Sequence, residues 1–154
     1  MVVTVDIQQA YSGWVPSSQL IQAWAELALQ EVAEDCELSV RLVDESESAD
    51  LNSTYRGKTG PTNVLSFPFD AEIELEPRLL GDLVICVPVV AQEAKTQAKA
   101  KEHHWAHMVV HGCLHLLGYD HIEDEQAKEM EALETRILKS LTINDPYQQQ
   151  GDET

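Results

Sequence analysis

The sequence predicts a single α+β domain in which a small mixed sheet of four strands is covered by about five helices. Two observations lead to this fold class. Short segments rich in β-branched and other apolar residues alternate along the chain with longer segments of helical periodicity. The 154 residues, 44% of them hydrophobic, suit one domain with a sizeable core. We expect this domain to span residues 1–141, followed by a polar C-terminal tail over 142–154.

Four segments have the pattern of strands. Residues 2–8 and 37–43 carry partly alternating apolar residues, as strands with one buried face do. Residues 64–69 contain a proline, which cannot donate a ladder hydrogen bond, so this strand is expected at a sheet edge. An acidic connection then leads to residues 83–87, which are continuously apolar, as in a strand buried on both faces. The order of elements allows a mostly parallel sheet with one edge strand reversed.

The remaining segments have helical periodicity. One helix is expected to begin after Pro16, and a short one covers about 45–55. The pattern over 88–117 is helical throughout, but about 30 residues is long for a helix in a domain of this size, so a break is expected near 99–104. The second part of that stretch is apolar nearly all round, which indicates a central buried helix. A charged helix over 123–139 ends the domain.

Composition limits the possible functions. The net charge of −17 excludes non-specific binding of polyanions, so a nucleic-acid role needs a local basic site, a metal ion or a partner that delivers the substrate. The three cysteines, Cys36, Cys86 and Cys113, are too few and too widely spaced for a disulfide framework, which favours the cytoplasm. No apolar run approaches the roughly 18 residues of a membrane span, and the first residues lack the basic region of a secretion signal.

The segment from His111 to His121, HGCLHLLGYDH, has the spacing of a metal site. His111 and His115 are four residues apart and share one helix face. Gly118 is expected to end the helix in a left-handed conformation, so that His121 can approach the pair from outside. Three imidazoles around one ion leave a fourth tetrahedral position open, which is the arrangement of a catalytic zinc. The sequence therefore predicts a site for one Zn²⁺ on the central helix.

Other histidines compete for that role. His107, His111 and His115 are spaced four apart, but residues eight apart on a helix are about 12 Å apart along its axis. One metal can therefore use only one adjacent pair, and the pair followed by the glycine turn is preferred. His107 is expected to line the same face or to support a ligand from behind. His103 and His104 are expected to be solvated residues at a helix start.

The spacing H-x3-H-x5-H is also used by metzincin peptidases. Those enzymes need a glutamate directly after the first histidine as general base, and here that position is Gly112. The absence of this glutamate argues against proteolysis. Cys113 lies about 200° around the helix from His111 and is expected to be a small core residue.

Three segments together resemble the YbeY family of bacterial endoribonucleases: the histidine motif, Asn52-Ser-Thr-Tyr-Arg56, and Pro61-Thr-Asn-Val-Leu-Ser-Phe67. The resemblance extends over most of the chain. It implies an α+β fold and a zinc-dependent, single-strand-specific endoribonuclease of the cytoplasm. Such an enzyme acts in 16S rRNA 3′-end maturation and in quality control of the small ribosomal subunit.

The resemblance also implies the site residues and the partners. The family's metal histidines fall on His111, His115 and His121, and its functionally important arginine falls on Arg56, which we expect to be catalytic. The expected partners are single-stranded RNA of the 16S precursor, the small ribosomal subunit and a basic ribosomal protein, with no membrane and no DNA.

Several mechanistic points stay open in the sequence. A zinc ion could activate water and polarise a phosphate oxygen, while Arg56 clamps a phosphate and Lys58 makes a second phosphate contact. Asp120 and Glu123 could act near the third ligand or orient the histidines. Attack by hydroxide and attack by the RNA 2′-OH both fit. Two other function classes also remain: a non-catalytic, zinc-stabilised ribosome-assembly factor and a metalloprotease.

Overall fold

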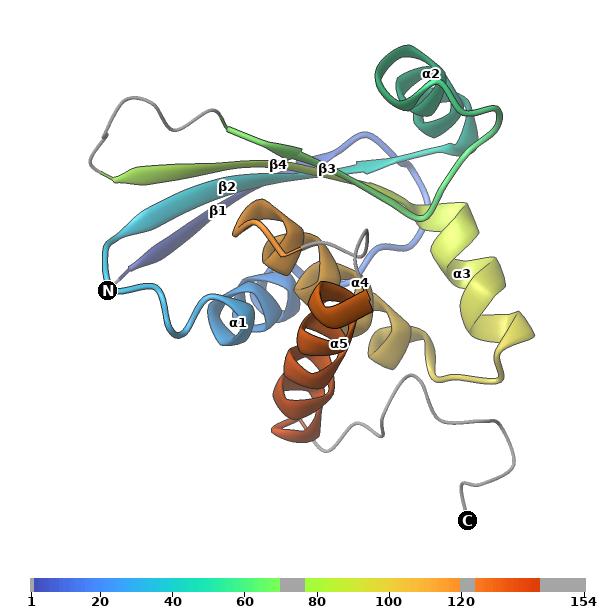
Figure 1. The fold of residues 1–154 in the computed structure, drawn as a ribbon. Coiled ribbons are helices and arrows are strands. Elements are labelled where there is room, and N and C mark those ends of the chain that lie inside the picture. Colours follow the sequence, from blue (N-terminus) through green and yellow to red (C-terminus); the bar gives the residue numbers. More distant parts are fainter. Residues whose placement is uncertain (1, 70–76, 120–123, 142–154) are drawn as a thin grey trace.

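The structure is a computed structural model that describes residues 2–69, 77–119 and 124–141, and it has the predicted α+β architecture (Figure 1). The described residues form four strands: β1 (Val3–Gln9), β2 (Cys36–Val43), β3 (Val64–Pro68) and β4 (Arg78–Cys86). They also form five helices: α1 (Ser18–Ala28), α2 (Glu45–Arg56), α3 (Val87–Thr96), α4 (Lys101–Leu116) and α5 (Asp124–Lys139).

The sheet is mixed, with the strand order β1-β2-β4-β3. β1, β2 and β4 are parallel, and β3 runs antiparallel to β4 at the edge, as its proline predicted. β4 begins at Arg78, earlier than the strand predicted over 83–87. The less apolar residues before Leu83 join the strand because they pair with β2, for example Leu79 with Glu37. Ladder hydrogen bonds thus extend the strand beyond its apolar run.

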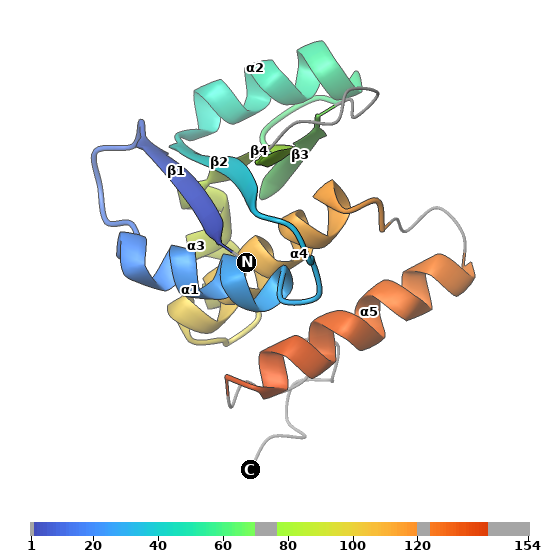
Figure 2. The same cartoon turned by 90° about the vertical axis from the view of Figure 1, so that its left-hand side faces the viewer.

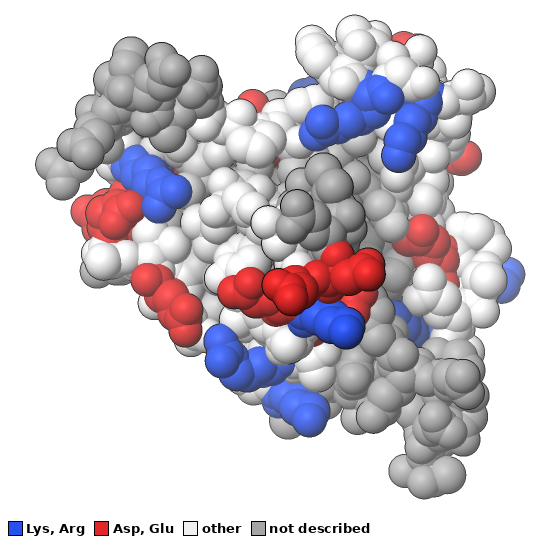
Figure 3. Space-filling model, viewed as in Figure 1, with Lys and Arg blue, Asp and Glu red and all other residues white. Residues whose placement is uncertain are grey.

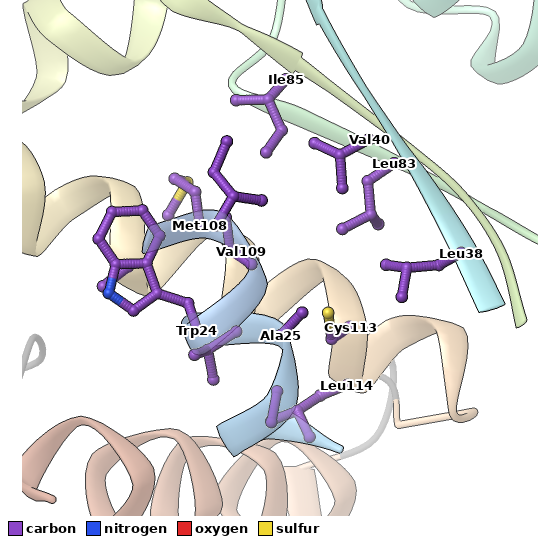
Figure 4. Close-up of a cluster of buried hydrophobic side chains, with 14 of the residues drawn as sticks. Trp24, Ala25, Leu38, Val40, Leu83, Ile85, Met108, Val109, Cys113 and Leu114 are labelled. Carbon is purple, nitrogen blue, oxygen red and sulfur yellow. The ribbon is translucent and has the colours of Figure 1, made fainter. Parts of the chain in front are cut away.

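The helices lie on both faces of the sheet. α2 covers one face, while α1 and α4 pack on the other and α5 lies outside them (Figures 1 and 2). α4 is therefore enclosed between the sheet and α5, which explains why its sequence is apolar nearly all round. Side chains from β2 and β4 point at α4 and α1 in Figure 4, where Val40 and Leu83 lie above Val109 and Cys113.

The break between the two central helices falls at residues 97–100, close to the predicted position. Because α3 folds back beside α4, His104 is 2% exposed, and the prediction that it is solvated was wrong. Its Nε2 lies 2.9 Å from the Glu93 carboxylate of α3. His103 is exposed, as predicted. None of the described helices is both long and apolar enough to cross a membrane.

Gly81 allows β3 and β4 to approach closely next to an irregularity in the pairing of β2 with β4. Its φ is +136°, and a Cβ atom there would lie 2.2 Å from the Phe67 carbonyl oxygen.

We expect Gly81→Ala to lower the free energy of unfolding by about 3 kcal/mol, because backbone strain and a steric clash combine. Urea denaturation measures this change. Gly60→Ala is the control, since Gly60 also has positive φ but open space around it; a cost of about 1 kcal/mol is expected there. Equal costs would contradict the steric argument.

His104 should make stability depend on pH. Burial lowers the pKa of His104 below 6.5, against an opposing effect of Glu93. At pH values between the pKa of His104 in the folded protein and its pKa in the unfolded chain, the unfolded chain binds more protons. The contribution of neutral His104 to the free energy of unfolding is therefore fully present above about pH 6.5, and it is lost as the pH falls through the folded pKa. The free energy of unfolding of the wild type should fall as the pH is lowered from about 7 to about 5. We expect this fall to be smaller in His104→Gln. The exposed neighbour provides the control: His103→Gln should retain the wild-type pH dependence, and identical curves for all three proteins would contradict the prediction.

Candidate functional site

The predicted histidine pair lies in the last two turns of α4. The helix ends at Leu116, and Gly118 follows with a φ of +104°, while its N–H donates to the His115 carbonyl at 3.0 Å. The predicted glycine end of this helix is therefore confirmed. It leaves His115 in the final turn and His111 one turn earlier, on the same face.

Both histidines open onto a cavity of about 690 Å³ between the end of α4, the end of α2 and β3. The structure thus brings together segments that are about 50 residues apart in the sequence. Arg56 and Lys58 line the cavity together with His111, His115 and Tyr119. The other lining residues are uncharged: Asn52, Thr62, Asn63, Val64, Leu65, Ser66, Pro68 and Gly118.

The charge of this cavity is opposite to that of the chain. The sequence has 27 acidic residues, yet none of the described residues that line the cavity is acidic. Two of the ten basic residues, Arg56 and Lys58, line it. In Figure 3 basic side chains gather near α2, while both acidic and basic side chains lie over α5. The cavity is therefore the local basic site that a nucleic-acid role requires in so acidic a chain.

Arg56 is the last residue of α2 and is exposed. Its Nη2 donates to the Ser66 carbonyl at 2.5 Å, and its guanidinium carbon lies 5.5 Å from the centre of the Phe67 ring. These contacts with β3 fix the direction of the side chain. A guanidinium has five N–H donors, so one bond to Ser66 leaves donors for a phosphate in the cavity.

The loop that carries Lys58 is held against α2 by buried polar side chains. The Asn52 side-chain amide donates to the Gly60 carbonyl at 2.8 Å, and the Ser48 hydroxyl exchanges two hydrogen bonds of 3.0 Å with the Thr62 backbone. Asn63 donates to the Glu93 carboxylate on α3. This wall of the cavity is thus preorganised by hydrogen bonds to two helices.

The ring nitrogens of the histidine pair face each other. Nε2 of His111 and Nε2 of His115 lie 3.1 Å apart, and the ring centres are 4.6 Å apart. Two nitrogens on one tetrahedral zinc, with bonds of about 2.05 Å, would be about 3.3 Å apart. The pair therefore fits a zinc ion held by both Nε2 atoms.

A carboxylate on α5 contacts His111 from the side away from the cavity, together with His107 one turn earlier. Glu134 is 0% exposed; its Oε1 lies 2.7 Å from Nδ1 of His111 and its Oε2 lies 2.8 Å from Nε2 of His107. One ligand atom from each of these three residues lies within 4.8 Å of the others, so His107, His111 and Glu134 could also hold a metal ion.

Some residues predicted for the site lie outside the described part of the chain. These are His121, Asp120 and Glu123, so the third histidine ligand stays a prediction. Cys113 is buried, and burial raises the pKa of its thiol to about 12, which suits a core residue and not a metal-binding thiolate.

Gly112 faces the sheet and not the cavity. A Cβ atom at this position would lie 2.8 Å from a Leu83 methyl carbon in the core. A glutamate there would place a carboxylate against buried apolar side chains of β4. The peptidase base is therefore absent at a position where close packing favours a small residue.

Glu134 is a residue of this site that was not predicted from the sequence. The sequence does show an acidic residue within an apolar helix face. Met130, Ile137 and Leu138 are buried on one face of α5, and Glu134 occupies the same face at helical spacing. A charged residue within an apolar stripe is almost never fully buried without a partner. Its partners could not be identified from local sequence, since they lie 23 and 27 residues away on α4.

Comparisons with known proteins identify the family of the chain. The family model of endoribonuclease YbeY matches residues 7–142. The fold is similar to the solution structure of TM1509 from Thermotoga maritima, with 27% sequence identity and a TM-score of 0.64 over 95% of this chain and all of that one. The matched region contains both walls of the cavity. The chain therefore belongs to the YbeY family of endoribonucleases.

Proposed function

We propose that the protein is a zinc-dependent endoribonuclease that cleaves single-stranded RNA in the cavity between α2 and α4. The observation that supports this most is the composition of the cavity. The cavity contains two imidazole nitrogens, of His111 and His115, that face each other 3.1 Å apart, and two basic side chains, of Arg56 and Lys58. None of its described lining residues is acidic. An anionic phosphodiester can enter such a site although the chain has a net charge of −17.

The ligands proposed for the single Zn²⁺ are His111, His115 and His121. The Nε2 atoms of the first two residues are imidazole nitrogens, which zinc commonly binds, and they face each other at a distance that one ion can span. When bound, zinc supplies Lewis acidity and lowers the pKa of a coordinated water. This chain's own part is to hold the scissile phosphate: Arg56 donates to its oxygens and stabilises the charge that develops there, and Lys58 contacts a neighbouring phosphate.

A single strand suits this cavity better than a duplex. A flexible strand can bend a phosphodiester into a concave site, and its unstacked bases can contact lining side chains such as Tyr119. A duplex is stiffer and presents its phosphates on a convex surface. We therefore propose the single-stranded 3′ region of the 16S rRNA precursor as the substrate, with no DNA substrate and no membrane association.

The acidic surface determines how the substrate is delivered. Outside the cavity the overall field repels free RNA, so the enzyme would bind naked RNA weakly. The same surface can dock on a basic protein. We therefore propose that it works in the cytoplasm on the small ribosomal subunit, docked to a basic ribosomal protein, in rRNA maturation and subunit quality control.

Substitution of the proposed ligands should remove metal and activity together. We expect His115→Ala and His111→Ala to lose bound zinc and to reduce cleavage of single-stranded RNA to background, because one side chain cannot replace a missing imidazole. Zinc content and cleavage of a labelled oligoribonucleotide measure the two effects. The exposed His103→Ala serves as control and should keep both.

The same assays discriminate between the function classes. A wild-type protein that binds one zinc but leaves RNA intact would be a non-catalytic assembly factor, and the proposed enzyme activity would be wrong. A third assay, casein cleavage with and without a chelator, tests the remaining class: cleavage that the chelator abolishes would indicate a peptidase.

Arg56→Ala should separate binding of metal from catalysis. We expect normal zinc content and a loss of RNA cleavage on the order of 10²-fold, since one preorganised donor to the reacting phosphate is removed. Arg136→Ala removes the same charge from an exposed side chain on α5 and should cleave at the wild-type rate. Normal cleavage by the Arg56 variant would show that the arginine does not take part in the reaction.

A further inference from the structure

We infer that Glu134 is a positioning residue that holds the ring of His111 from behind, so that the opposite nitrogen of this ring is presented to the metal. In this arrangement Glu134 acts through His111 and does not bind the metal itself. The inference rests on the metal site of the proposed function. It adds a residue of α5 to a site otherwise built from α2, β3 and α4.

The hydrogen bonds define the orientation of the ring. We infer that Glu134 is ionised. A carboxylate then only accepts hydrogen bonds, so the proton lies on Nδ1 of His111, 2.7 Å from Glu134 Oε1. In a neutral imidazole Nε2 then has the free lone pair. That nitrogen is the one that faces Nε2 of His115 at 3.1 Å. Glu134 thus selects the tautomer in which His111 can ligate an ion beside His115.

The second oxygen of the carboxylate is also engaged. Oε2 of Glu134 lies 2.8 Å from Nε2 of His107, one turn before His111 on α4. Bonds from two imidazoles on one helix fix the plane of the carboxylate, which in turn fixes the ring of His111. His107 therefore helps to hold the ring of His111 through Glu134. Of the three histidines spaced four apart on α4, His107 is the supporting residue and His111 and His115 are the metal ligands.

The location of Glu134 argues against a direct metal ligand. Its side chain is 0% exposed, and the His107 side chain is 10% exposed, whereas His111 and His115 line the cavity. An ion between His107, His111 and Glu134 would lie behind the histidine pair, where a substrate phosphate in the cavity could not reach an open coordination position. An ion held by the two facing Nε2 atoms lies on the cavity side.

The test compares Glu134→Gln with Glu129→Gln, which removes the same charge from an exposed position of the same helix. Zinc binding to the metal-free full-length chains is measured by competition with a chromophoric chelator, with His115→Ala as the variant that lacks a ligand. We expect Glu134→Gln to bind one zinc with affinity 10-fold to 100-fold weaker than wild type, a typical effect of removing the partner of a metal-binding histidine. Glu129→Gln should bind like wild type.

A second measurement reads the orientation directly. Long-range ¹H–¹⁵N correlation NMR of the metal-free wild type distinguishes the two tautomers of His111, and the Nδ1–H form is expected. Observation of the Nε2–H form would overturn the inference. Zinc binding by Glu134→Gln as tight as that of wild type would also overturn the inference. So would a complete loss of zinc binding in Glu134→Gln or in His107→Ala, as expected for His115→Ala. These outcomes are independent of RNA cleavage, so failure of the proposed nuclease activity would be recognised separately by the RNA assay.

Discussion

The packing of α4 between the sheet and α5 is the constraint on which the rest of the structure depends. One side of this helix packs closely against β4, where a Cβ atom at position 112 would lie 2.8 Å from a Leu83 methyl carbon. The opposite side is closed by α5, which contributes a buried carboxylate to two of the helix's histidines. The C-terminal end of the helix is left open toward the cavity, and there His111 and His115 face it. Burial of the helix therefore determines which of its polar residues can meet a substrate.

Much of this arrangement could be predicted from local patterns. The spacing of His111, His115 and Gly118 identified a shared helix face and the end of α4, because helical geometry fixes both. The proline of β3 identified an edge strand, and the apolar character of residues 104–117 identified a buried helix. These features depend on neighbours in the sequence, so their physical cause is visible there.

Features that depend on distant segments could not be predicted. The start of β4 is set by pairing with β2, and the burial of His104 is set by the return of α3 along α4. Glu134 is a further example: its sequence position marks it as unusual, but only the tertiary structure shows which rings it contacts. The basic character of the cavity likewise emerges only when Arg56 and Lys58 meet α4, since the chain as a whole is strongly acidic.

The cavity is lined by residues of α2, β3 and α4 and supported from behind by Glu134 of α5, and this has a consequence for the chain during synthesis. When the ribosome has produced residues up to β3, the arginine is present without the imidazoles. Even after α4 has emerged, the carboxylate of Glu134 is still missing. A nascent or truncated polypeptide therefore lacks the contacts of Glu134 with His107 and His111 until α5 has docked. Such late completion would restrain an RNA-degrading activity from acting on the messenger or on the ribosome that is translating it.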